Sequence, residues 1–194
     1  MLPLAAARIS PLDRGFLFGD GVYETMKVLG GRPLFRAAHL ERLAASLAGF
    51  AIAWPEGLEG EIAALLAAAG SYDGSLYVQV TRGAEPVRRH RPASGATPTR
   101  FLLPAACDFP ADPAAAGGLA AISRPDWRWR RCDLKTTALA GAVLGGLDAA
   151  REGADEVLFA GPEGSCAKGA ARTSSPAAAT GSRPTHWDHG SSPG

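Results

Sequence analysis

The sequence predicts an α+β protein with two domains, of which the second is incomplete. Segments with the apolar periodicity of helices alternate with short segments that are typical of strands. A stretch rich in Ala, Pro and Gly, residues 105–117, is the best candidate for a domain boundary. After residue 165 neither periodicity continues. We therefore expect an N-terminal domain over residues 1–110, the start of a C-terminal domain over 111–165, and an aberrant, disordered tail over 166–194.

The first domain begins with a strand and two helices. Residues 22–29 predict the strand, and Gly30-Gly31 predicts the turn that follows it. Helices are expected over about residues 37–50 and 58–69, because apolar side chains recur there at helical spacing. These side chains are Leu40, Leu43, Leu47 and Phe50 in the first helix and Leu58, Ile62, Leu65 and Leu66 in the second.

The rest of the chain predicts four more strands and one helix. Apolar and polar side chains alternate over residues 76–81, as in a half-buried strand, and a loop rich in Pro, Gly and Arg follows over 83–99. The other expected strands are 100–104, 118–123 and 155–160. A helix is expected over 138–151, with a Thr cap and an apolar stripe of Leu139, Val143, Leu144 and Leu147. Glycines within this helix favour close packing.

Composition excludes several classes of protein. The formal charge is +1, from 20 basic and 19 acidic residues, so no overall field favours nucleic acid or a membrane surface. Three cysteines without paired spacing argue against a disulfide framework and against a zinc site. No signal peptide is evident, and no apolar run approaches the roughly 20 residues that span a bilayer. We therefore expect a cytoplasmic protein that binds neither nucleic acid nor membrane.

Lys135 is one of only three lysines, the others being Lys27 and Lys168. It stands between Leu134 and the Thr-capped apolar helix. A solvated lysine at the start of a helix would explain this position. A partly buried amine would instead suit imine formation with an aldehyde. The periodicity of the sequence does not choose between these two interpretations.

Four segments, in order, resemble the class IV (fold type IV) aminotransferases, which use pyridoxal 5'-phosphate (PLP). The resemblance covers nearly all of residues 9–165 and implies the two-domain fold of that family, with the second domain incomplete. The segments are Leu12-Asp-Arg-Gly-Phe-Leu-Phe-Gly-Asp-Gly-Val-Tyr-Glu24, His39-Leu-Glu-Arg-Leu43, Tyr77-Val-Gln-Val-Thr-Arg-Gly83 and Arg131-Cys-Asp-Leu-Lys-Thr-Thr137. The first and the fourth are the specific ones.

The reaction implied by the resemblance is transamination between an amino acid, of D configuration, and a 2-oxo acid. Arg131-Cys-Asp133 before the lysine and Gly141-Ala-Val-Leu144 after it are most similar to D-amino-acid transaminases. Ala140 stands where the branched-chain enzymes usually carry tyrosine. An aminodeoxychorismate lyase, a relative of the branched-chain aminotransferases and a non-catalytic remnant stay open as alternatives.

The resemblance also implies which residues form the cofactor site. Lys135 would hold PLP covalently and move a proton between substrate and cofactor. Arg42 matches the arginine that binds the cofactor phosphate. Tyr23 matches a tyrosine beside the lysine and the substrate carboxylate, although an aromatic residue in a strand can equally belong to the core. No metal site is implied.

A loop of the first domain is implied in substrate binding. In the D-amino-acid enzymes an Arg-x-His pair, on a loop from the dimer partner, binds the substrate carboxylate. The loop here is Pro86-Val-Arg-Arg-His-Arg-Pro92. Without gaps Val87 falls at the position of that arginine, whereas a shift of one residue places Arg88 and His90 at the pair. The resemblance therefore implies both residues as substrate ligands, and a homodimer at full length.

The resemblance ends in the tail. A family glutamate that pairs with the protonated pyridine nitrogen corresponds to Lys168, a cation that would oppose protonation of the ring. Arg172-Thr-Ser-Ser-Pro176 stands where the family has Asn-Val-Phe, which one reverse translation recovers two bases out of frame. We interpret the tail as mostly frameshifted and then truncated. The chain is accordingly expected to bind PLP weakly at best and to lack useful transaminase activity.

Overall fold

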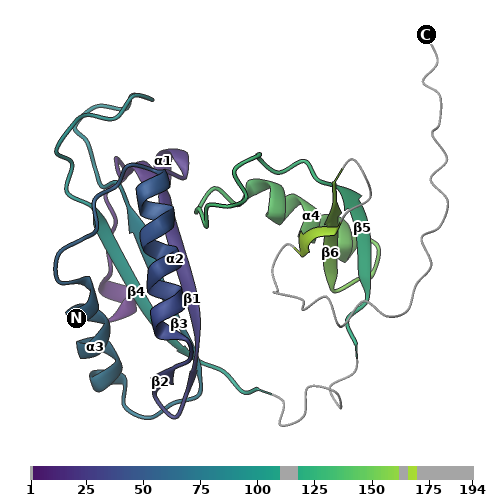
Figure 1. Cartoon of the computed structure of the whole chain (residues 1–194), viewed down its shortest axis with the longest axis horizontal. Coiled ribbons are helices and arrows are strands. Elements are labelled where there is room, and N and C mark those ends of the chain that lie inside the picture. Colours follow the sequence, from purple (N-terminus) through teal and green to yellow (C-terminus); the bar gives the residue numbers. More distant parts are fainter. Residues whose placement is uncertain (1, 110–117, 162–165, 170–194) are drawn as a thin grey trace. The chain divides into compact units, whose positions relative to one another are not determined.

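The structure, a computed structural model, describes residues 2–109, 118–161 and 166–169 (Figure 1). The chain divides into two compact units, each with its own sheet. Unit 1 comprises Met1–Ala116 and Arg128–Gly141, and unit 2 comprises Gly117–Trp127 and Ala142–Gly194. No helix among the described residues is long and apolar enough to cross a membrane.

Unit 1 is an antiparallel sheet with two longer helices on one face (Figure 1). Its strands are β1 (Gly21–Leu29), β2 (Arg32–Pro33), β3 (Gly74–Thr81) and β4 (Thr99–Ala106), in the spatial order β2-β1-β3-β4. Its helices are α1 (Arg14–Phe18), α2 (Arg36–Gly49) and α3 (Leu58–Ala69), preceded by a 3-10 turn at Leu4–Ala6. The strands and helices predicted between residues 22 and 104 are confirmed to within two residues at each end.

Alternation along β1 determines which face of the sheet is buried. Every second residue has no exposed surface, namely Val22, Glu24, Met26 and Val28, and these side chains face α2 and α3. They pack with Leu76, Val78 and Val80 of β3, Leu43 and Leu47 of α2, and Leu58 and Ile62 of α3. Tyr23, Thr25 and Lys27 lie on the opposite face. Glu24 is therefore a charged residue in an apolar row, and it needs partners on α2.

Unit 2 is smaller. It contains β5 (Ala121–Pro125), the greater part of α4 (Ala140–Arg151), β6 (Glu156–Ala160) and β7 (Cys166–Gly169). Strand β5 is parallel to β6, with a helical crossover between them, and β7 is antiparallel to β6. Among the described residues, its buried core is Ala149, Val157 and Phe159. The expected strands 118–123 and 155–160 and the expected helix 138–151 are thus present with shifted ends.

The apolar stripe expected on α4 does not face the sheet. The residues of this stripe are between 41% and 59% exposed; they are Leu139, Val143, Leu144 and Leu147. The helix packs instead through its small residues, because a Cβ atom built on Gly145 would lie 2.7 Å from Cζ of Phe159. Gly145 and Ala149 are accordingly the buried residues of α4. The expectation that glycine favours close packing in this helix is confirmed at Gly145.

The predicted domains, 1–110 and 111–165, divide the chain differently from the two units. The difference arises because Arg128–Gly141 packs with unit 1. Strand β7 lies inside the tail 166–194 that the sequence predicts to be aberrant. The remainder of that tail, from residue 170, lies outside the described residues.

Candidate active site

The segment that carries Lys135 runs beside the beginning of β1. Thr136 forms an antiparallel bridge with Val22, and the amide of Tyr23 donates to the carbonyl of Lys135 at 2.9 Å. The buried hydroxyl of Thr136 donates to the carbonyl of Gly21 at 3.1 Å. Strand β2 pairs with the far end of β1, at Val28 and Leu29. The segment that carries Lys135 pairs with the near end of the same strand, at Val22 and Tyr23. The main chain at Lys135 is therefore fixed by the sheet.

The side chain of Lys135 lies over an aromatic ring. Its Nζ atom is 4.0 Å from the centroid of Tyr23, and both residues are half-buried. On the same face of the sheet, Tyr77 lies 5.5 Å from Tyr23, ring to ring. Burial, together with Tyr23, raises the pKa of Tyr77 to about 12. Tyr77 is therefore a neutral phenol that donates to Gln79, and it brings no negative charge to the amine.

Arg42 meets β1 from the helix side. Its Nε and Nη2 atoms donate to the two carboxylate oxygens of Glu24, the latter at 2.6 Å. His39, one turn earlier on α2, places Nδ1 2.7 Å from Glu24 Oε2. Half of the Arg42 side chain is exposed, and among the described residues Nη1 has no hydrogen-bond partner, so this group can reach an anion. Arg42 and His39 thus neutralise the buried carboxylate of Glu24, and one edge of the Arg42 guanidinium stays available to another group.

The charges in this cluster reinforce one another. Burial alone would raise the pKa of Glu24, but hydrogen bonds from Arg42 and His39 hold that pKa below its usual value. The hydrogen bond to Glu24 raises the pKa of Arg42, with a smaller contribution from Tyr23. Tyr23 and Glu24 are neighbours in β1, but their side chains lie on opposite faces of the sheet, so Lys135 meets this strand from one face and Arg42 from the other.

Arg88 and His90 converge on a different ring. The guanidinium carbon of Arg88 lies 4.9 Å from the centroid of Phe18, and the ring of His90 lies 5.5 Å from it. Val87, at the position of the family arginine without a gap, is 63% exposed. Arg88 and His90 therefore lie against the same aromatic residue of α1, Phe18. This ring is a different one from that of Tyr23, which contacts Lys135.

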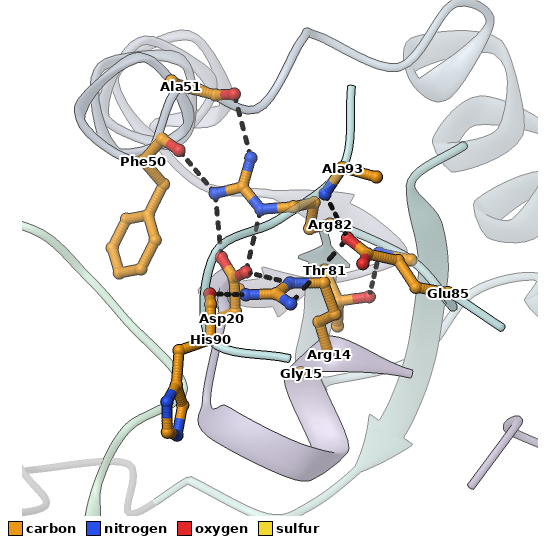
Figure 2. A network of polar contacts seen from close by, with 12 residues as sticks. Arg14, Gly15, Asp20, Phe50, Ala51, Thr81, Arg82, Glu85, His90 and Ala93 are labelled. Carbon is orange, nitrogen blue, oxygen red and sulfur yellow. Dashed lines mark hydrogen bonds and ion pairs between the residues drawn. The ribbon is translucent and has the colours of Figure 1, made fainter. Parts of the chain in front are cut away.

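Sequence reasoning missed a buried polar network behind this loop (Figure 2). Asp20 accepts hydrogen bonds from Arg14 at 2.7 Å and from Arg82 at 2.8 Å. Arg82 also donates to the carbonyls of Phe50 and Ala51. Burial would raise the pKa of Asp20, yet the hydrogen bonds from Arg82 and Arg14 lower it overall. The only signal in the sequence was that these charges lie in the first and third family-like segments.

Lys168 belongs to β7, where its main chain pairs with Phe159. Its side chain lies outside the described part of the structure. Whether it meets the cofactor ring therefore stays a prediction from the sequence. Among the described residues, no three or more His, Cys, Asp or Glu side chains gather as they would to hold a metal ion.

A family model described as amino-transferase class IV matches residues 21–173. The D-alanine aminotransferase of Bacillus licheniformis is 36% identical over 137 residues, which are 68% of this chain and 47% of that protein. The chain spans about half the length of the curated relatives that it matches.

Solved structures of the same fold also match. The 4-amino-4-deoxychorismate lyase from Pseudomonas aeruginosa superposes with a TM-score of 0.66 and 28% identity, over 86% of this chain and 62% of that one. A hypothetical aminotransferase from Mycobacterium tuberculosis, in its PLP-bound form, gives a TM-score of 0.70 at 24% identity, over 87% and 62% of the two chains.

Proposed function

The chain belongs to the class IV aminotransferases, and from this premise we propose that its function is PLP-dependent transfer of an amino group between a D-amino acid and a 2-oxo acid. The observation that carries the proposal is the position of the Lys135 amine, 4.0 Å above the ring of Tyr23. The ring face attracts the protonated amine and so restricts where it lies, and the neutral amine formed when the proton leaves is the nucleophile for an aldehyde.

The residues present fit the chemistry of PLP. The cofactor has an aldehyde and a phosphate, which call for an amine and a fixed cation. Lys135 supplies the amine, and Arg42 supplies a guanidinium whose partner Glu24 leaves the Nη1 edge available. The Glu24 carboxylate fixes the plane of that guanidinium, so less side-chain entropy is lost when an anion binds. When bound, PLP supplies an electron sink for the carbon that loses its proton.

Each residue then has a definite task. Nζ of Lys135 binds the cofactor, and later accepts and returns the proton of the reacting carbon. Tyr23 restricts where that amine can point. The hydrogen bond from the Tyr23 amide to the Lys135 carbonyl fixes the backbone from which the Lys135 side chain extends. Arg42 binds the phosphate. These tasks are all performed by residues of unit 1.

Arg88 and His90 are proposed as ligands of the substrate carboxylate. Both side chains lie against the ring of Phe18, so two hydrogen-bond donors stand close together, as the two oxygens of a carboxylate require. The Arg88 guanidinium can bind a carboxylate through two parallel hydrogen bonds. The D configuration rests on the likeness to a D-alanine aminotransferase. A homodimer, in which this loop serves the site of the partner, and residence in the cytoplasm complete the proposal.

Cofactor trapping tests the assignment of Lys135. The chain is incubated with one equivalent of PLP and reduced with borohydride, and the labelled peptide is identified by mass spectrometry. We expect the label on Lys135, and its loss in Lys135→Arg. Lys27→Arg is the matched control, because Lys27 also lies over an aromatic ring, that of Phe109 at 3.9 Å. A label of equal yield on Lys27 or Lys168 would contradict the proposal.

A lyase that acts on aminodeoxychorismate is the second candidate, favoured by the 28% identity to such an enzyme. A hybrid distinguishes the two, with residues 1–161 followed by the C-terminal portion of the Bacillus licheniformis relative. We expect the hybrid to form pyruvate from D-alanine and 2-oxoglutarate in preference to releasing pyruvate from aminodeoxychorismate. The opposite preference would favour the lyase.

A further inference from the structure

Arg14 is bound to the middle of the loop that carries Arg88 and His90 (Figure 2). Its Nη1 atom donates to the carbonyl of Arg89 at 2.7 Å, and Nη2 donates to the carbonyl of His90 at 2.8 Å. Nε donates to Asp20. Only 4% of Arg14 is exposed. Every nitrogen of this guanidinium is therefore used, and two of the three hold the backbone of the loop.

Asp20 and Glu85 balance the charge that is buried with Arg14. Nη1 of Arg14 lies 3.8 Å from a carboxylate oxygen of Glu85, and only 5% of Glu85 is exposed. Asp20 is shared with Arg82, which is itself anchored to the end of α2 by backbone carbonyls. Loss of one member would leave a buried charge without its partner. The position of Arg14 is therefore strongly determined by its surroundings.

The loop is also closed upon itself by Glu85. One oxygen of Glu85 accepts a hydrogen bond from the amide of Ala93 at 2.9 Å, and the other accepts one from Nε of Arg89 at 3.2 Å. Residues 85 and 93 are thus joined, and Arg14 binds the chain between them. This arrangement fixes the backbone on both sides of the Arg89–His90 peptide.

Phe18 receives the side chains that this backbone presents. It stands four residues after Arg14 on α1, and the guanidinium carbons of Arg14 and Arg88 each lie 4.9 Å from its centroid. The ring of His90 contacts it as well. A cation over a ring face is attracted by the ring quadrupole. One aromatic residue therefore gathers both side chains of the proposed carboxylate ligand pair.

We propose that Arg14 is a positioning residue that fixes the loop 85–93 and, with Phe18, presents Arg88 and His90 as a preformed carboxylate site. The inference rests on the proposed function, because that function assigns the substrate carboxylate to this pair. A purely structural role for Arg14 would stabilise unit 1 without ordering the loop or holding His90 against Phe18.

The experiment uses the 194-residue chain without cofactor. Arg14→Lys keeps the charge between Asp20 and Glu85 but removes the forked donors. We expect exchange of the Ala93 amide, which donates to Glu85 and closes the loop, to accelerate about ten- to hundredfold, as the loss of charge-assisted hydrogen bonds predicts. The His90 ring protons should lose the ring-current shift that Phe18 causes, whereas exchange in β1 and β3 should not change. Arg91→Ala, which removes an exposed cation from the same loop, is the matched control and should affect the loop far less.

Phe18→Leu is the second variant, and it decides the question if Arg14→Lys fails to fold. It removes the ring and its contact with Arg14, but it leaves the hydrogen-bonding groups of Arg14, Asp20 and Glu85 in place. Pyruvate is then titrated into each folded variant while the His90 resonances are followed. We expect a saturable shift in the unmodified chain and a weaker affinity in both variants. Unchanged loop exchange and unchanged affinity would overturn the positioning role. If pyruvate does not shift His90 in the unmodified chain, the proposed carboxylate site itself is wrong, and the inference fails with it.

Discussion

Units 1 and 2 differ in how completely their apolar side chains are covered. In unit 1 the apolar row of β1 is buried beneath two helices, and its charged member Glu24 has two partners on α2. Among the described residues of unit 2 the buried core is three residues, and the apolar side chains of Val143, Leu144 and Leu147 on α4 are exposed. The segment with Lys135 belongs to the well-packed unit. The residues of the candidate site therefore belong to the unit whose described residues form the larger buried core.

The largest expected effect concerns catalysis by the chain as it stands. We expect no turnover of D-alanine and 2-oxoglutarate above that of free PLP. The sequence places a cation, Lys168, at the position of the glutamate that pairs with the pyridine nitrogen, and a cation there would oppose protonation of the ring. Purified chain, PLP and a pyruvate assay provide the measurement. Robust turnover by a uniformly folded chain would contradict this expectation.

The next largest effect concerns substitutions of apolar side chains, which should destabilise unit 1 much more than unit 2. Leu43→Ala in unit 1 removes a side chain without exposed surface, so it should lower the free energy of unfolding by roughly 2–5 kcal/mol. Leu144→Ala on α4 removes a side chain that is 57% exposed, so the change should stay within about 0.5 kcal/mol. Urea unfolding followed by peptide-level hydrogen exchange measures both. Similar losses in the two variants would mean that the α4 face is covered in solution.

The same contrast explains what the sequence could predict. Leu76, Val78 and Val80 alternate strictly, and one buried face fixes the register of such a strand. On α4, by contrast, the apolar stripe of Val143, Leu144 and Leu147 predicted the wrong packing face. Helical periodicity identifies an apolar face, but close approach to β6 requires a small residue at Gly145. The periodicity does not reveal which of these two requirements decides the packing.

The resemblance to the family predicted some residues of the candidate site but not the contacts of the others. Lys135, Arg42 and Tyr23 lie in such segments, and two of them are in contact. Arg14 shows why the remainder escaped. It is 75 residues from Arg89 and binds that residue through a backbone carbonyl. A carbonyl is present at every position, so the identity of the residue carries no signal of the contact. Only the fold brings the two together.

Substrate affinity gives a smaller expected effect than the core. In the hybrid described above, Arg88→Ala or His90→Ala should raise the KM for D-alanine about ten- to hundredfold, which corresponds to roughly 1.5–3 kcal/mol for a lost charge-assisted contact. PLP affinity should be nearly unchanged. Arg91→Ala, an exposed neighbour on the same loop, is the control. An equal rise of KM in the control would show that general positive charge, rather than the pair, attracts the substrate.

The smallest expected effect is the acid response of unit 1. The pKa of Glu24 in the fold lies below its ordinary value of 4.5. Its ionised form therefore stabilises the fold above that ordinary value, and the stabilisation is lost as the pH falls through the lower, folded-state pKa. Glu24→Gln should be less stable than the unmodified chain near pH 7, and the difference should shrink on acidification.

Glu41→Gln, which removes an exposed carboxylate from α2, controls for the change in net charge. Hydrogen exchange of β1 peptides between pH 7 and pH 3, corrected for intrinsic rates, measures the acid response, and β6 peptides of unit 2 serve as an internal reference. The β6 peptides should respond equally in all three proteins, because Glu24 and its partners belong to unit 1. If Glu24→Gln and Glu41→Gln gave parallel profiles in β1, the buried cluster of Glu24, Arg42 and His39 would not contribute to the stability of unit 1.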